Sequence, residues 1–182
     1  MFIERRRKMK YNIREVLYQD QDEMIYVQEI LLSLRQNYPN FKQWLEKKVM
    51  TQLGNTRKII VALSEQVIVG IMVLKNTVSE RKICTLWVQK EYRKNGIGTD
   101  LMEYAIEELE TKYPLITMSE NSYMDFLPLM EEFNFQLKRR YRGYYQPGVI
   151  EYAYNGLLEE SVTDECCIIF NQTAICSSNP TW

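Results

Sequence analysis

The sequence predicts a single α+β domain, in which helices pack on a mixed, mostly antiparallel sheet. Three observations support this. Residues 58–63 and 67–74 are apolar, β-branched runs joined by a short polar segment, which is typical of an antiparallel hairpin. A further run, residues 82–88, leads into a glycine turn and an amphipathic helix. The run at residues 115–118 follows that helix, so a crossover connection makes it parallel to residues 82–88.

Before the first hairpin, the sequence predicts one strand and two helices. Residues 11–18 carry enough apolar side chains for a short strand. Asp20, with a glutamate three residues later, has the spacing of a capping box, and an apolar stripe continues to residue 34. The sequence Tyr-Pro-Asn at residues 38–40 ends that helix, and residues 41–53 form the next.

After the glycine turn, residues 97–109 have apolar side chains at three- to four-residue spacing, with glutamates on the other face. A shorter helical stripe follows at residues 126–133, with Pro128 expected in its first turn. Residues 135–144 and 149–154 are predicted to form a final hairpin.

The predicted domain spans residues 1–156, and residues 157–182 are read as an extension that is partly ordered at most. Within this extension, residues 166–170 could add a strand or cover one. The basic run at residues 5–8 is interpreted as a solvated leader.

The composition is that of an ordinary globular protein, with 46% hydrophobic and 26% charged residues among 182. A net charge of −1 argues against nucleic acid or an anionic membrane as the main partner. No apolar run is long enough to cross a bilayer, and a cytoplasmic location is expected. The four cysteines lack zinc-type spacing, so no metal is expected. The chain has no histidine, which excludes every histidine-based mechanism.

Residues 93–99, Arg-Lys-Asn-Gly-Ile-Gly-Thr, form the turn between a strand and a helix. Glycines let the backbone turn tightly and let a ligand approach the main chain. The first amides of a helix have no intrahelical partner and carry the positive end of its dipole, which favours phosphate. A dinucleotide site would need three glycines and a Walker loop would need Gly-Lys-Ser/Thr, and neither pattern is present.

Residues 86–98 resemble the acetyl-coenzyme A (acetyl-CoA) motif of the GNAT superfamily of N-acetyltransferases. In that family an Arg/Gln-x-x-Gly-x-Gly/Ala turn follows the fourth strand and opens the next helix, and residues 93–98 fit without a gap. The expected element order is also that of the GNAT fold. The resemblance covers roughly residues 11–154 and implies a single-domain GNAT-like fold, with strands 4 and 5 parallel around the cofactor site.

The resemblance implies direct transfer of the acetyl group from acetyl-CoA to a primary amine, without a covalent enzyme intermediate. Strand 4 would pair with the pantetheine arm, and the Val88 amide would face the developing oxyanion. The implied cofactor-binding residues are Trp87, Val88, Arg93, Lys94, Asn95, Gly96, Ile97, Gly98 and Thr99.

The catalytic groups are less defined, because the chain departs from the family pattern. Many relatives carry a tyrosine acid in the helix after strand 5, where this chain has Met130, and Asn134 replaces the following glycine. A thioether cannot donate a proton. The candidates are therefore Glu120 as a base acting through water, Tyr123 as a substitute acid, and Ser119 beside them. Three tyrosines of the final hairpin are less favoured candidates: Tyr141, Tyr144 and Tyr145.

Two alternatives to an amine acetyltransferase are kept open. A binding or regulatory module of the same fold would retain the CoA pocket without turnover, consistent with the missing tyrosine. An acetyltransferase of toxin type acting on aminoacyl-tRNA would use the basic, tyrosine-rich residues 138–145, although the overall acidity argues against RNA. The acceptor, a small molecule or a protein amine, and a homodimer are not determined by the sequence.

Overall fold

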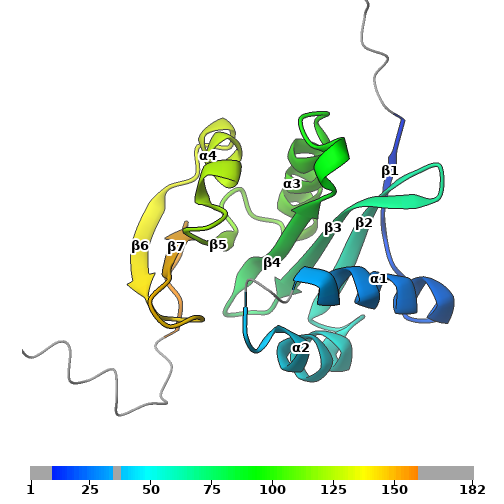
Figure 1. Ribbon diagram of the computed structural model, residues 1–182, viewed down its shortest axis with the longest axis horizontal. Coiled ribbons are helices and arrows are strands. Elements are labelled where there is room, and N and C mark those ends of the chain that lie inside the picture. The colour runs from blue at the N-terminus through cyan, green and yellow to red at the C-terminus, as the bar shows by residue number, and fades with distance from the viewer. Residues whose placement is uncertain (1–9, 35–37, 160–182) are drawn as a thin grey trace, which may run out of the picture.

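The computed structural model describes residues 10–34 and 38–159 (Figure 1). Its seven-stranded sheet has the order β1-β2-β3-β4-β5-β7-β6. The strands are β1 (Asn12–Glu15), β2 (Arg57–Ser64), β3 (Val67–Asn76), β4 (Arg81–Val88), β5 (Leu115–Ser119), β6 (Leu137–Arg142) and β7 (Ile150–Tyr154). The α-helices are α1 (Gln21–Ser33), α2 (Phe41–Trp44), α3 (Ile97–Glu108) and α4 (Tyr123–Glu132). The predicted α+β architecture and element order are confirmed.

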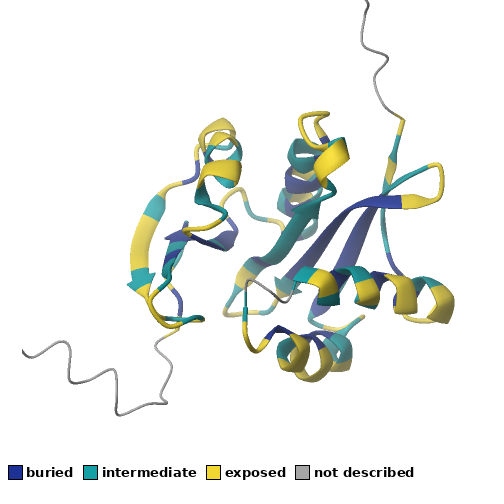
Figure 2. Cartoon of the chain, in the orientation of Figure 1, coloured by how far each residue is buried: buried dark blue, intermediate teal, exposed yellow. Residues whose placement is uncertain are grey.

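Helices cover both faces of the sheet (Figure 1). On one face, α3 and α4 pack over a core that includes Leu101, Met102 and Met130. On the other, α1 and α2 pack over a second core that includes Val27 and Leu45. The inner strands β2 and β3 are the most buried, and the edge strand β6 is largely exposed (Figure 2). Each face of the sheet is therefore buried by its own pair of helices, in three layers.

Two helices differ from the sequence prediction. The helix expected at residues 41–53 changes its winding, from α2 to a π turn at Leu45–Val49 and a 3-10 turn at Met50–Gln52. The helix α4 begins at Tyr123, earlier than expected, so Pro128 lies inside the helix and not in its first turn. That placement of Pro128 was wrong. Residues 119–122 have no apolar periodicity that marks where the helix begins.

The start of α1 confirms the predicted cap but not the full capping box. The Asp20 carboxylate accepts a hydrogen bond from the Glu23 N–H at 3.1 Å. The Glu23 side chain turns instead to Arg14 on β1, and its two oxygens accept from that guanidinium at 2.6 and 2.9 Å. The bidentate pair fixes α1 against the edge strand.

The strands β4 and β5 are parallel, as predicted, but only Lys82↔Leu115 and Ile83↔Ile116 pair between them. Directly after Ile83, the β3–β4 register shifts, so that Cys84 is the extra residue of a bulge. A bulge bends its strand and strengthens the local twist. The rest of β4 therefore diverges from β5, and two unpaired strand edges face each other across the gap.

Gly70 on β3 lets α3 approach the sheet. A Cβ at this position would lie 3.0 Å from Leu101 Cδ1 and 3.1 Å from Ile97 Cγ2. We expect Gly70→Val to destabilise the fold by about 2 kcal/mol through overpacking, measured by urea unfolding. Stability within about 0.5 kcal/mol of the wild type would contradict close helix packing at this point.

The domain boundary at residue 156 stays a prediction. Leu158 is buried, it packs against Leu115 and Ala153, and its N–H donates to the Tyr141 hydroxyl at 3.0 Å. The sequence interpretations of residues 5–8 and 166–170 lie outside the described residues. Within the described part of the chain, no helix is long and apolar enough to span a membrane.

Candidate active site

The glycine turn between β4 and α3 has the backbone geometry that its sequence requires. Lys94 and Gly96 adopt φ values of 63° and 88°, and Gly96 is the N-cap of α3. The Asn95 amide group donates to the carbonyls of Tyr92 and Arg93 at 3.1 and 3.2 Å, which braces the turn. A side chain at Gly96 would strain the left-handed conformation.

The turn presents a row of free amides. The Arg93 N–H donates to Lys90 O, and the next backbone N–H with a partner among the described residues is that of Asp100, which donates to Gly96 O at 2.9 Å. A Cβ at Gly98 would meet no atom within 4 Å, so this side of the helix start is open space. Free amides at a helix N-terminus, with room for an anion, fit a phosphate group.

The gap between β4 and β5 exposes further backbone groups. The Gln89 N–H donates to Val69 O on β3 at 2.9 Å. Because backbone groups alternate along a strand, the N–H and C=O of Val88 point the other way, into the gap. On β5, the Glu120 N–H donates to Ile150 O on β7 at 2.8 Å, so the amides of Thr117 and Ser119 also face the gap.

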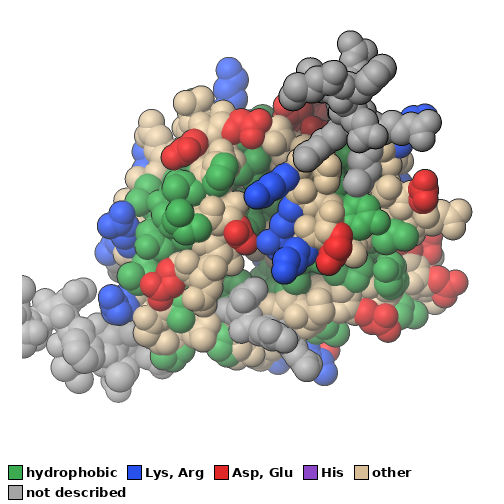
Figure 3. All heavy atoms as spheres, turned by 45° about the horizontal axis from the view of Figure 1, so that its top comes forward, with side chains coloured by type: hydrophobic (Ala, Val, Ile, Leu, Met, Phe, Trp, Pro, Cys, Tyr) green, Lys and Arg blue, Asp and Glu red, His purple; other side chains and the backbone are tan. Residues whose placement is uncertain are grey.

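Two contacts join the turn to α4 across the opening. Arg93 Nε donates to Val88 O at 3.0 Å, and its Nη1 lies 3.1 Å from Asp125 Oδ2. The Thr99 hydroxyl donates to Glu132 Oε2 at 3.1 Å. Figure 3, in which this end of the molecule is turned toward the viewer, shows Lys and Arg side chains gathered near the centre of the face. Asp125 and Glu132 thus tie the turn to α4, and acidic as well as basic side chains border the opening.

The family profile of the acetyltransferase (GNAT) domain matches residues 23–138, well over half of the chain. The chain belongs to the GNAT acetyltransferase family. No curated protein sequence matches it.

Solved GNAT structures share this fold. An acetyltransferase from Bacillus subtilis in complex with CoA has a TM-score of 0.57 and 19% identity, over 82% of this chain and 100% of that one. A Bacillus anthracis protein described as a streptothricin acetyltransferase, in complex with acetyl-CoA, gives 0.56 and 16%, over 81% and 97%. The Escherichia coli ribosomal-protein-S18-alanine N-acetyltransferase gives 0.57 and 14%, over 85% and 100%. At such identities the likeness shows the fold.

The residues predicted to bind the cofactor lie together at the end of β4 and the start of α3. Val88 offers its N–H to the gap, while its C=O accepts from Arg93. Trp87 instead pairs with Ile71, and its backbone groups belong to the β3–β4 ladder. Arg93 is engaged by Val88 and Asp125, and Lys94 is exposed. Their roles stay a prediction.

The three predicted catalytic residues do not form one cluster in this GNAT domain. The Glu120 carboxylate accepts the Ile150 N–H at 3.1 Å, so it points toward β7. The Ser119 side chain lies on the α1–α2 face of the sheet. Tyr123 is on the opposite face, where it stacks on Tyr152 at 4.2 Å and accepts a hydrogen bond from the Tyr154 hydroxyl at 3.3 Å. Their catalytic roles are still predictions.

Sequence reasoning missed Glu151, which pairs with Ser119 across the β5–β7 ladder. Glu151 is only 2% exposed. Burial raises the pKa of Glu151 to about 7, although Thr117, the Tyr38 hydroxyl and the charge of Lys82 each lower it. The signal in the sequence was one acidic residue within an otherwise apolar strand, Ile-Glu-Tyr-Ala-Tyr.

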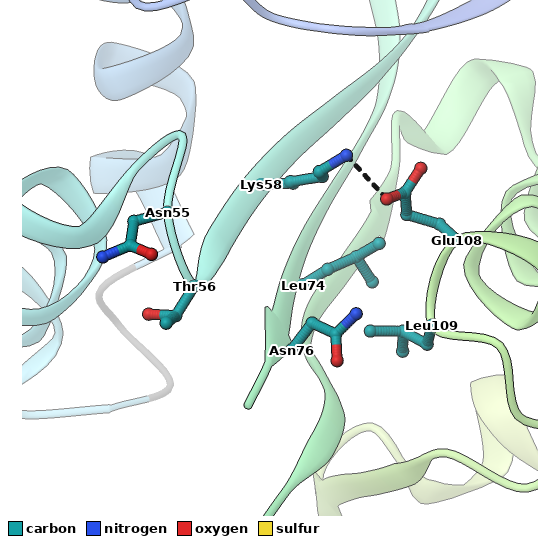
Figure 4. Close-up of a pocket in the computed structure, with 7 residues that line it drawn as sticks. All are labelled: Asn55, Thr56, Lys58, Leu74, Asn76, Glu108 and Leu109. Carbon is teal, nitrogen blue, oxygen red and sulfur yellow. Dashed lines mark ion pairs between the residues drawn. The ribbon is translucent and has the colours of Figure 1, made fainter. Parts of the chain in front are cut away.

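A separate small cavity of about 90 Å³ lies at the other end of α3, far from the glycine turn (Figure 4). The Lys58 ammonium pairs with Glu108 at 2.6 Å beside it and with Glu15 at 3.2 Å. These partners satisfy the charges there, so the cavity offers no reactive group. No group of side chains suited to hold a metal ion occurs within residues 10–34 and 38–159.

Proposed function

We propose that this GNAT domain transfers an acetyl group from acetyl-CoA to a primary amine. The observation that carries the proposal is the divergence of β4 and β5 immediately after Ile83 and Ile116, beside a helix that begins with free amides. The gap between the strands suits an extended thioester arm, and the free amides suit a diphosphate. Relatives with this fold are described as complexes with CoA or acetyl-CoA, which supports the same ligand here.

The proposed site has two parts. The amides of residues 95–99 would hold the diphosphate, with Lys94 supplying positive charge and Gly98 leaving room for close approach. The edge of β4 would hold the pantetheine arm as an added strand. The Val88 N–H then points into the gap, where it can stabilise negative charge on the thioester oxygen.

In the proposed reaction, removing a proton from the amine costs more free energy than releasing the thiolate without a proton. An amine of pKa ~10.4 is about 3.4 units above pH 7, so its deprotonation costs about 4.6 kcal/mol. A thiol of pKa ~8.5 makes a thiolate leaving group that costs only ~2 kcal/mol. An acid at Met130 is therefore dispensable, and Met130 is fully buried in the core between α3 and α4.

A non-catalytic CoA-binding module is the second candidate, favoured by the methionine at the position of the family's tyrosine acid. An RNA acceptor is supported by the exposed basic residues of β6, which are Lys138, Arg139, Arg140 and Arg142. The cytoplasmic location and a homodimer stay predictions.

Calorimetry with acetyl-CoA, followed by thiol release with a panel of amines, separates the candidates. The panel comprises methylamine, spermidine, L-lysine, kanamycin and an alanyl-terminated peptide. We expect micromolar binding and thiol release with at least one amine. Binding without release from any amine would favour the module, and no binding at all would remove both candidates. A tRNA affinity that falls steeply with salt would favour the RNA acceptor.

A further inference from the structure

We propose that Glu151 is the base of the transfer reaction and that it receives the acceptor amine in the gap between β4 and β5. This inference rests on the proposed function and adds the residue that takes the proton. It differs from the sequence prediction, which favoured Glu120.

The position of Glu151 follows from the ladder. Ser119 and Glu151 are a pair whose backbone groups point away from each other, and side chains of such pairs lie closest together. Ile116 and Met118 face α3 and α4, so Ser119 and Glu151 share the α1–α2 face. Glu151 therefore lies one strand away from the unpaired edge of β5, on the face opposite α3.

Two segments far apart in the sequence meet beside this carboxylate. The hydroxyl of Tyr38, which lies between α1 and α2, donates a hydrogen bond to Glu151 Oε1 at 3.4 Å. Tyr145, between β6 and β7, stands edge-on to the Tyr38 ring at 5.6 Å. The Tyr38 hydroxyl also lies next to the Ser119 backbone, at the β5 edge. Tyr38 and Tyr145 thus meet beside the carboxylate, next to the gap in which the acceptor amine is proposed to bind.

The polar groups around Glu151 are incompletely satisfied. The Ser119 Oγ is buried and has no hydrogen-bond partner among the described residues, and Ser119 is 2% exposed. A buried hydroxyl without a partner costs free energy unless a ligand or water completes it. The long Tyr38–Glu151 contact is also weak for a bond to a carboxylate. An ammonium group, with three donors, would supply the missing partners.

Polar and titratable side chains surround Glu151 from each neighbouring element. They are Tyr38 from the α1–α2 connection, Lys82 from β4, Thr117 and Ser119 from β5, Tyr141 from β6 and Tyr145 from the β6–β7 connection. The Lys82 ammonium donates to the Tyr145 hydroxyl at 3.3 Å, and its charge lowers the pKa of Glu151. Burial dominates and raises the pKa of Glu151 to about 7, which suits a base at neutral pH.

In the proposed step, the ionised Glu151 carboxylate takes one proton from the bound ammonium. The nitrogen lone pair then forms the N–C bond to the acetyl carbon, and the C–S bond breaks with its electron pair on sulfur. The remaining excess proton on nitrogen passes to the thiolate, and Glu151 releases its proton to solvent. The products are the amide and the CoA thiol, and no oxidant or other reactant is needed.

The experiment compares Glu151→Gln with the wild type, using acetyl-CoA and the amine panel named above. We expect unchanged acetyl-CoA binding by calorimetry, a loss of at least 100-fold in kcat/KM, and loss of the rise in the rate profile near pH 7. Glu151→Asp, which keeps a carboxylate, should restore part of the rate. The matched control is Glu107→Gln on the exposed face of α3, with an unchanged profile.

Each outcome decides the assignment. If the wild type turns over and Glu151→Gln keeps its rate and pH profile, Glu151 is not the base, and the proposed function stands. If Glu120→Gln loses the rise near pH 7 instead, the base is Glu120. If the wild type binds acetyl-CoA but acetylates no amine, the transfer activity and the role of Glu151 are both wrong. Thermal unfolding of each variant separates these results from misfolding.

Discussion

Gly98→Val is expected to weaken acetyl-CoA binding by roughly 100-fold without destabilising the fold. The Val side chain would occupy the open space in front of the first turn of α3, because a Cβ there meets no protein atom within 4 Å. A diphosphate displaced from these amides would lose about two charge-assisted hydrogen bonds of ~1.5 kcal/mol each. The protein itself should tolerate the change, since glycine is the poorer helix former.

Calorimetry measures the affinity for acetyl-CoA, and thermal unfolding measures the stability of the fold. Gly156→Ala is the matched control, because its Cβ would only touch Leu115 at an ordinary 3.4 Å and lies away from the turn. It should bind acetyl-CoA like the wild type. If Gly98→Val is folded and binds with native affinity, the diphosphate is not held by this turn.

Glu151→Gln is expected to stabilise the protein by about 3 kcal/mol at pH 8. The folded-state pKa of Glu151 is raised from 4.5 to about 7, so ionisation is easier in the unfolded chain. The cost to stability is absent below about pH 4.5, grows as the pH rises to 7, and is complete above it. The neutral amide avoids this cost, so the variant should gain most at pH 8 and little at pH 5.

Urea unfolding at pH 5 and pH 8 gives the difference directly, and a gain of this size should raise Tm by roughly 6–12 °C. Glu107→Gln, the same change on an exposed helix face, should alter stability by less than about 0.5 kcal/mol at either pH. An equal effect of Glu151→Gln at the two pH values would show that the carboxylate titrates normally. Stabilisation together with lost activity would mark a residue kept for function.

The architecture and the glycine turn were predictable because local signals determine them. The alternating and β-branched runs specify strands, and the short connection at residues 64–66 forces an antiparallel pair. The crossover through residues 97–108 makes β5 parallel to β4. Gly96 marks where the backbone turns, and Gly98 marks where the start of α3 faces open space. These features depend on residues within one or two elements of each other.

The sequence by itself therefore determined the layers, the strand directions and the glycine turn that opens α3. Only the tertiary structure decided that β4 and β5 part after two residue pairs, because the bulge at Cys84 depends on how β4 registers with β3. It also decided that Glu151 lies beside Ser119 and beside Tyr38, and Tyr38 is 113 residues away from Glu151 along the chain. The reason is physical: the burial that raises a carboxyl pKa comes from neighbours that only the folded sheet brings together.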